Sequence, residues 1–204
     1  MWAVLAAACG VYTVVKAGWI PLVIGIIGGI VVLLYSMGRL PISYLPLGEF
    51  FSGVVMGGGI TLACFTAQSG VFSWRILWYA MPPILTIGLI MLTNNTCDIE
   101  RDRPAGRRTL PVLLGHRRAA WLLKLLAAVS LILSGYIVFG RFRGGFFLFP
   151  VAAFAAMLHW VRLAASPVDA SERGLCMGCI LKLTVTVNGC YCIMIVLHLL
   201  REVL

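Results

Sequence analysis

The sequence predicts an all-α protein, a polytopic bundle of about seven transmembrane helices in one domain over residues 1–204. Composition is the first indication: 61% of the 204 residues are hydrophobic, 11% are charged and the mean hydropathy is +1.01, whereas a soluble domain carries about 25% charged residues. Continuous apolar runs are the second. In lipid, every backbone polar group has to be satisfied internally, and runs that do not alternate between apolar and polar residues favour helices over a β-barrel.

Seven hydrophobic segments give the expected helices. A span needs roughly 20 apolar residues to cross a hydrocarbon core of about 30 Å. The first segment is short because Lys16 interrupts it, and the others approach this length. The segments cover residues 1–15, 19–36, 50–67, 74–93, 119–140, 145–164 and 175–200.

The connecting loops are of two kinds, which alternate along the chain. Loops 16–18, 68–73 and 141–144 are short, whereas loops 37–49, 94–118 and 165–174 are longer and richer in polar residues and turn formers. Positively charged loops stay in the cytoplasm, and the arginines concentrate in the longer loops. We therefore expect a multi-pass protein of the cell membrane with these loops cytoplasmic. The net charge of +9 does not indicate nucleic-acid binding, because the basic run lies between two spans and alternates with acids.

The loop 94–118 carries the main concentration of acidic residues. Three of the seven acids fall between Asp98 and Asp102. If the preceding helix continues for another turn, these two aspartates share one face, where like charges repel each other. A divalent cation relieves the repulsion, and Mg²⁺ commonly uses one or two carboxylates together with substrate phosphate. Asn94 and Asn95, one turn earlier, add neutral oxygen ligands or amide donors.

Two arginines extend this site toward a phosphate ligand. Arg107 and Arg108 carry planar guanidinium forks that match the geometry of phosphate. Pro104 and Gly106 are expected to break the helix and fold the arginines back. The sequence therefore predicts a Mg²⁺-diphosphate site at the membrane surface. A solvated loop whose charges neutralise one another is the alternative, because D-x-x-x-D alone is a weak motif.

Two extended patterns give a more specific indication. Residues 94–110 read N-N-x-x-D-x-x-x-D-x-x-x-G-R-R-T-L, and residues 35–49 read Y-S-x-G-x-x-P-x-S-x-x-P-x-G-E. The first resembles the second aspartate-rich motif of the UbiA superfamily of intramembrane prenyltransferases. The second resembles the loop before that motif in the MenA-like branch, the 1,4-dihydroxy-2-naphthoate polyprenyltransferases. The two patterns in this order are more specific than either alone.

The resemblance implies a bundle of nine transmembrane helices around a central cavity. In this family, two aspartate-rich motifs face each other at the cytoplasmic side, and each helps to hold Mg²⁺ for the diphosphate of a polyprenyl donor. The isoprenoid tail lies in a groove that faces membrane lipid. The implied reaction moves the polyprenyl group from polyprenyl diphosphate to an aromatic quinone precursor, 1,4-dihydroxy-2-naphthoate in this branch, during menaquinone biosynthesis.

The resemblance also implies roles for individual residues. Asp98 and Asp102 would be the catalytic pair that binds metal and diphosphate. The expected substrate-binding residues are Asn94, Asn95, Arg107 and Arg108 on the diphosphate and Tyr35, Tyr44 and Glu49 on the acceptor side. Tyr44 equally fits an interfacial aromatic belt.

Lys182 is a candidate from the residues alone. It lies about 10 Å inside the last expected span, at 1.5 Å per residue. A charge within a span is a functional hypothesis, although snorkelling of the lysine to the interface is the simpler interpretation. The two interpretations are compatible if the lysine amine reaches the interface and contacts the diphosphate there.

The chain departs from the family in its first half. Before Asp98 the only acidic residue is Glu49, so the first aspartate-rich motif is missing, and we expect seven spans rather than nine. These features predict a family member that lacks its first two helices. Either Met1 is an internal start within a longer protein, or the gene is truncated. We expect the 204-residue chain alone to be weakly active or inactive.

Two other functions compete with the enzyme. A transporter or other non-catalytic helical bundle is the first, but transporters place charges near the midplane, whereas these acids cluster at one surface. A CDP-alcohol phosphotransferase is the second. The motif of those enzymes resembles D-x-x-D-G-x-x-A-R followed by two more aspartates, and this chain does not contain such a run.

Overall fold

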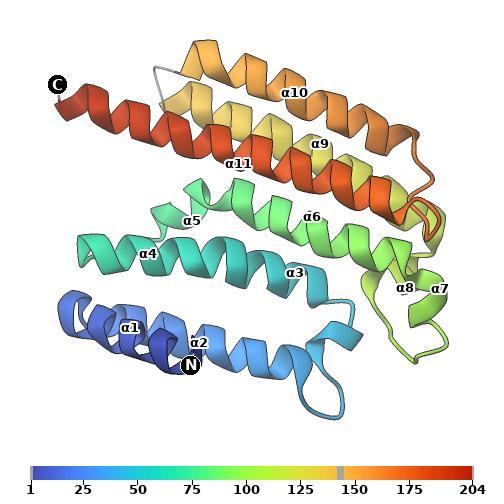
Figure 1. Cartoon of the computed structure of the whole chain (residues 1–204), viewed down its shortest axis with the longest axis horizontal. Coiled ribbons are helices and arrows are strands. Elements are labelled where there is room, and N and C mark those ends of the chain that lie inside the picture. Colours follow the sequence, from blue (N-terminus) through green and yellow to red (C-terminus); the bar gives the residue numbers. More distant parts are fainter. Residues whose placement is uncertain (1, 142–144, 204) are drawn as a thin grey trace.

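The structure, a computed structural model, describes residues 2–141 and 145–203, and within these ranges it is helical with no strand. Seven long helical runs form the bundle (Figure 1), which confirms the predicted all-α class. The runs are α1 (Trp2–Ala17), α2 (Trp19–Ser36), the continuous run of α3 (Gly48–Ser52), η2 (Gly53–Gly59) and α4 (Ile60–Ser69), the pair α5 (Arg75–Tyr79) and α6 (Met81–Cys97), α9 (His116–Arg141), α10 (Gly145–Ala165) and α11 (Arg173–Val203).

Five stretches in the described ranges are long and apolar enough to cross a membrane. They are Trp19–Ser36, Gly48–Ser69, His116–Arg141, Leu148–Ala165 and Arg173–His198. The helices α1 and α6 are shorter, with 16 and 17 residues. The prediction of a single helix over 74–93 is wrong in detail, because the structure divides this segment at Ala80 into α5 and α6. Pro82 and Pro83 in the first turn of α6 have no backbone N–H with which to continue the hydrogen bonds of α5.

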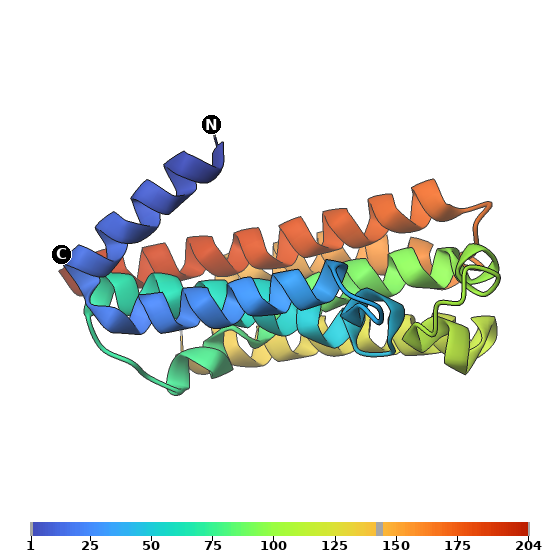
Figure 2. The ribbon, with the colours of Figure 1, turned by 90° about the horizontal axis from the view of Figure 1, so that it is seen from below.

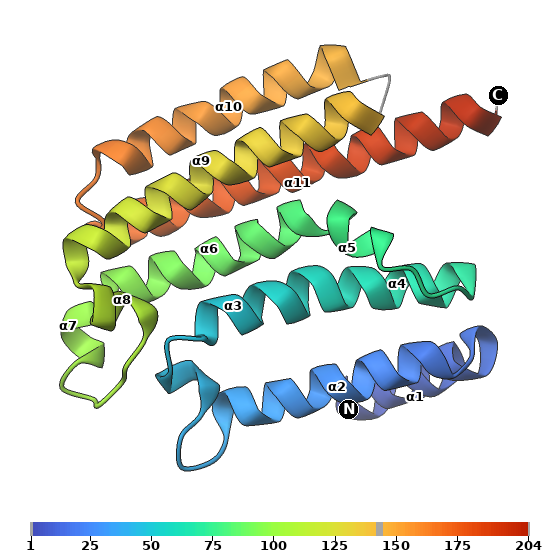
Figure 3. The ribbon, with the colours of Figure 1, turned by 180° about the vertical axis from the view of Figure 1, so that it is seen from behind.

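The helices form two groups with α6 between them (Figures 1 and 3). On one side, α6, α9, α10 and α11 pack against one another around fully buried aliphatic side chains such as Leu123, Leu163 and Ile180. On the other side lie α2 and the run α3–η2–α4, which contacts α6 through α3 and η2. The helix α1 contacts α2 and α4 and diverges from the other helices (Figure 2).

Glycines bring the backbones of η2 and α6 into direct contact. A Cβ atom on Gly53 would lie 2.5 Å from the Ile84 carbonyl oxygen, and one on Gly57 would lie 2.5 Å from the Ile84 nitrogen. Gly88 of α6 is close to the Glu49 carbonyl oxygen in the same way, at 3.2 Å. Small residues of this kind drive helix association in lipid, where van der Waals packing replaces the hydrophobic effect.

The three longer loops meet at one end of the bundle, as their alternation predicts (Figure 1). Three short helices that the sequence did not predict lie there: η1 (Ile42–Tyr44), α7 (Ile99–Asp102) and α8 (Leu110–Leu114). The turns at Gly18 and Gly70 lie at the opposite end, and both glycines have positive φ. The alternation of loop types therefore brings the loop 94–118 to the same end as the loop 37–49, where the Arg108 N–H donates to the Tyr44 carbonyl.

Replacing Gly57 with alanine should destabilise the bundle by about 1–3 kcal/mol, because the added methyl group meets the Ile84 backbone. Thermal unfolding in detergent micelles, followed by circular dichroism, measures the effect. Gly59→Ala is the matched control. Gly59 lies in the same segment, η2, which is a π-helix, and the nearest neighbour of the added Cβ atom would be 3.8 Å away. Equal unfolding temperatures for the two variants would contradict the proposed contact.

Candidate metal and diphosphate site

The two aspartates of the predicted site lie one helical turn apart. The helix α6 ends at Cys97, and Asp98 has a non-helical backbone (φ −100°, ψ 8°). Nevertheless, the Asp98 N–H donates to the Asn94 carbonyl at 3.1 Å, and the Asp102 N–H donates to the Asp98 carbonyl at 2.8 Å. Because the four-residue spacing continues through the kink, Asp98 and Asp102 share one face, as predicted.

A tight turn after α7 folds an arginine back onto the second aspartate. Gly106 has φ +72°, a conformation that favours glycine. The Arg107 N–H donates to the Asp102 carbonyl at 3.0 Å, and Arg107 Nη1 donates to Asp102 Oδ1 at 3.2 Å. The Arg107 guanidinium also lies 4.9 Å from the centre of the Tyr44 ring, within the range of cation–π attraction.

Arg173, at the start of α11, holds the first aspartate. Its Nη1 donates to Asp98 Oδ1, and its Nη2 donates to Asn94 Oδ1 at 2.5 Å. One guanidinium fork therefore ties the last turn of α6 to the first turn of α11. Arg101 also reaches Asp98, at 3.6 Å, but its side chain is 76% exposed, so this second pair is screened by solvent.

Glu49 and Tyr35 join the group from the neighbouring loop. Glu49 is buried, and its Oε1 accepts a hydrogen bond of 2.8 Å from Asn95 Nδ2. The Tyr35 hydroxyl lies beside Gly48 and interacts electrostatically with Glu49 and Arg107. The acceptor-side candidates thus lie next to the aspartate motif.

The Asp102 carboxyl is nearly inaccessible, with 5% of the residue exposed. Burial raises the pKa of Asp102, and the Arg107 guanidinium opposes this shift. Asp102 Oδ2 is buried, and no hydrogen-bond donor in the described part of the chain reaches it. A buried carboxylate oxygen without a partner is costly, so this atom is suited to receive a cation or a ligand donor.

The residues present fit one Mg²⁺ ion that shares its coordination with a substrate. Among residues 2–141 and 145–203, no group of three or more His, Cys, Asp or Glu side chains is placed to enclose a metal. Mg²⁺ does not require such a group, because it usually keeps several waters and takes one or two carboxylates plus phosphate oxygens. Asp98 and Asp102 supply this number, and Asp102 Oδ2 is the free oxygen.

The structure brings most of the predicted site residues together. The assembled residues are Tyr35, Tyr44, Glu49, Asn94, Asn95, Asp98, Asp102 and Arg107. Arg108 joins them through its backbone, whose N–H donates to the Tyr44 carbonyl at 2.7 Å, while its side chain is exposed. The roles of these residues remain predictions.

One predicted residue lies apart, and one residue of the site was missed. Lys182 is exposed on α11 and interacts electrostatically with His159 of α10. Within residues 2–141 and 145–203, no hydrogen bond or ion pair joins Lys182 to the aspartates. Arg173 was not among the predicted site residues. Its separation of 75 residues from Asp98 left no local pattern, and its place in a loop on the same side as the motif was the available signal.

Fold and site together define an α-helical integral membrane protein with paired aspartates and arginines at one end of its bundle. The chain belongs to the UbiA prenyltransferase family, whose model matches residues 1–180. This match confirms the resemblance seen in the sequence.

Individual relatives give the same result. The chain is 37% identical to the 1,4-dihydroxy-2-naphthoate octaprenyltransferase of Bacillus subtilis over 137 residues, which are 67% of this chain and 44% of that protein. It is 31% identical over 116 residues to the UbiA prenyltransferase domain-containing protein 1 homolog of Drosophila melanogaster, covering 56% of this chain and 31% of the relative. The chain thus spans less than half the length of these relatives. No solved structure matches it.

Replacing Arg173 with leucine should lower the free energy of unfolding by about 1–2 kcal/mol, because Asp98 loses its charged hydrogen bond in a partly buried place. Thermal unfolding in detergent measures the loss. Arg101→Leu removes the exposed partner of the same aspartate and should cost no more than about 0.5 kcal/mol. The assignment of Arg173 is wrong if the two variants unfold alike.

Proposed function

We propose that the protein is a Mg²⁺-dependent prenyltransferase that moves a polyprenyl group from polyprenyl diphosphate to an aromatic acceptor. The observation that carries the proposal is the placement of Asp98 and Asp102 between two arginine forks, Arg107 and Arg173. A diphosphate is stabilised by a metal ion and by guanidinium groups, and this arrangement offers two carboxylates for the metal and two guanidinium groups at one end of an apolar bundle.

The residues of the chain would act by binding and orienting the donor. Asp98 and Asp102 hold the metal, which, when bound, stabilises the negative charge of the diphosphate leaving group. Arg107 and Arg173 pair with the aspartates in this structure, and their remaining N–H groups can donate to phosphate oxygens. Since the aspartates alone would repel an anionic donor, the arginines make its approach favourable.

Features outside the site support the finer parts of the proposal. An apolar groove of about 610 Å³ lies between α2 and the run η2–α4 and extends to Trp19, Phe72 and Trp74, near the end of the bundle opposite the aspartates. Its walls suit an isoprenoid tail. The name of the Bacillus subtilis relative favours 1,4-dihydroxy-2-naphthoate as the acceptor and menaquinone biosynthesis as the process. The arginine-rich loops favour a cytoplasmic site in the cell membrane.

Binding of the donor tests the proposal without depending on turnover. The chain in lipid nanodiscs is titrated with farnesyl S-thiolodiphosphate, which resists ionisation, with and without Mg²⁺. We expect binding that requires Mg²⁺ and that weakens at least about tenfold in Asp102→Asn, because a charged partner of the metal is lost. Glu100→Gln is the control, since Glu100 is exposed and neighbours the motif.

Transfer is then tested in the same nanodiscs with polyprenyl diphosphate and 1,4-dihydroxy-2-naphthoate. Mass spectrometry detects prenylated product, and its loss in Asp98→Asn and Asp102→Asn supports the enzyme. Donor binding that is indifferent to Mg²⁺ and to both substitutions would contradict a metal-diphosphate site at these aspartates.

A further inference from the structure

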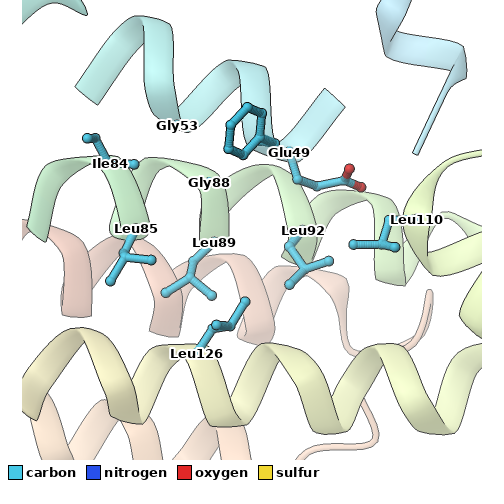
Figure 4. A pocket seen from close by; sticks show the side chains of 10 residues that line it. Glu49, Gly53, Ile84, Leu85, Gly88, Leu89, Leu92, Leu110 and Leu126 are labelled. Atoms are coloured by element: carbon cyan, nitrogen blue, oxygen red, sulfur yellow. The ribbon is translucent and has the colours of Figure 1, made fainter. Parts of the chain in front are cut away.

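The first turns of α9 carry basic side chains at the same end of the bundle as the aspartates (Figure 1). Further along α9, Leu126 lines an apolar cavity beside α6 (Figure 4). At 3.6 residues per turn, Arg117, Trp121 and Lys124 lie on the opposite side of the helix. This basic side of α9 therefore faces away from that cavity.

A groove of about 370 Å³ follows this side of α9. One wall comes from α9, and Pro167, in the connection between α10 and α11, contributes the other. Among the lining residues, Arg117 and Lys124 are cationic, His116 is titratable and none is acidic. The α9 wall consists of His116, Arg117, Ala120, Trp121 and Lys124.

Contacts with α9 hold the facing wall in a fixed shape. Lys124 Nζ donates to the Ala164 and Ser166 carbonyls at 2.8 and 2.9 Å. His116 Nε2 lies 3.0 Å from the Val168 carbonyl oxygen. Val168 is β-branched and fully buried, yet its φ is +59°, a conformation that such residues rarely adopt. The surrounding contacts stabilise this strained turn, so the groove is preformed.

The cationic side chains of the groove have no acidic partner. Within residues 2–141 and 145–203, no ion pair reaches Arg117 or Lys124. The Lys124 amine has three N–H groups and gives two of them to backbone carbonyls. Asp169 interacts electrostatically with His116, but its Oδ1 already accepts hydrogen bonds from residues 171 and 172. The groove therefore has guanidinium and ammonium donors left for an anionic ligand.

The depth of the groove matches that of lipid headgroups. The helix α9 has 26 residues, a length of about 39 Å, which exceeds a hydrocarbon core of about 30 Å. Because charges avoid the hydrocarbon, Arg117 at one end and Arg141 at the other mark the parts that extend beyond it. Trp121 is 65% exposed, and tryptophan is typical of the membrane interface.

We propose that this groove binds the headgroup of an anionic phospholipid, with the phosphate on Arg117 and Lys124 and the glycerol and upper acyl chains against Trp121. The guanidinium fork fits phosphate, and basic clusters beside membrane spans attract anionic lipids. A zwitterionic lipid would bring its own cation into this positive field. A free phosphate ion would leave the exposed indole of Trp121 uncovered. The site does not depend on the proposed function, since it consists of other residues.

Competition between two lipids in one bilayer tests the site on the unaltered protein. The chain is placed in nanodiscs that contain phosphatidylglycerol and phosphatidylcholine in equal amounts, with the same acyl chains. Native mass spectrometry then measures which lipid stays bound. Charged hydrogen bonds to a net anion predict that phosphatidylglycerol is retained at least about tenfold more often. Equal retention of the two lipids would overturn the proposal.

Glycerol 3-phosphate distinguishes a lipid site from a site for soluble phosphate esters. It presents a similar anion without acyl chains, so it should leave the retained phosphatidylglycerol in place when the two are equimolar. Displacement of the lipid at this ratio would show that the groove takes a soluble phosphate ester, and would contradict the lipid assignment.

Variants then locate the preference. Arg117→Gln removes one cation from the groove and should reduce the preference to about threefold or less, whereas Arg117→Lys keeps the charge and should retain most of it. Arg118→Gln is the matched control, because Arg118 is the adjacent exposed arginine and does not line the groove. Full preference in Arg117→Gln, or an equal loss in Arg118→Gln, would show that diffuse positive charge attracts the lipid and would overturn the site.

Discussion

The close contact between the run α3–η2 and α6 is the constraint on which the rest of the structure depends. Gly53 and Gly57 allow the two backbones to touch, because any side chain there would meet the backbone of residue 84. This contact places Glu49 close enough to α6 for its carboxylate to accept the hydrogen bond of Asn95. The Glu49–Asn95 hydrogen bond of the polar site therefore depends on the close packing of these two helices.

Charge at the site is balanced in pairs before any ligand arrives. Arg107 neutralises Asp102, and Arg173 neutralises Asp98. Buried charges are tolerated when they are paired and hydrogen-bonded, so the folded chain keeps two carboxylates next to each other at a membrane surface. Under the proposed function, a metal cation would join the aspartates and an anionic diphosphate would join the arginines, so the ligands would enter with charges of opposite sign.

Much of the fold could be predicted because the signals are local. Lys16, Gly18 and Gly70 separate apolar runs, and the observed helices follow those runs closely. The division of the helix at Ala80 was also encoded in Pro82 and Pro83, but hydropathy outweighed that signal. The π-helix at 53–59 could not be predicted, because its hydrogen bonds differ from those of an α-helix by one residue only.

The site residues also divide into those whose contacts could be predicted from local spacing and those whose contacts could not. Asp98, Asp102 and Arg107 were predicted because they lie within one turn or one loop of each other, where spacing determines which side chains meet. The contacts made by Glu49 and Arg173 join residues 46 and 75 positions apart in sequence. Such contacts depend on how helices pack, and a single sequence carries no measure of that.

The π-helix lies within one continuous helical run whose two ends pack against different helices. Its first part, α3 and η2, lies against α6, whereas α4 lies against α1 and α2. The wider turns over 53–59 set the rotation between these two faces. Removing one residue from this stretch would turn α4 by about 100° relative to α3, and the buried Leu62 and Thr66 would then face lipid. The length of this segment thus determines how α4 is rotated relative to α3, the end of the helix that carries Glu49.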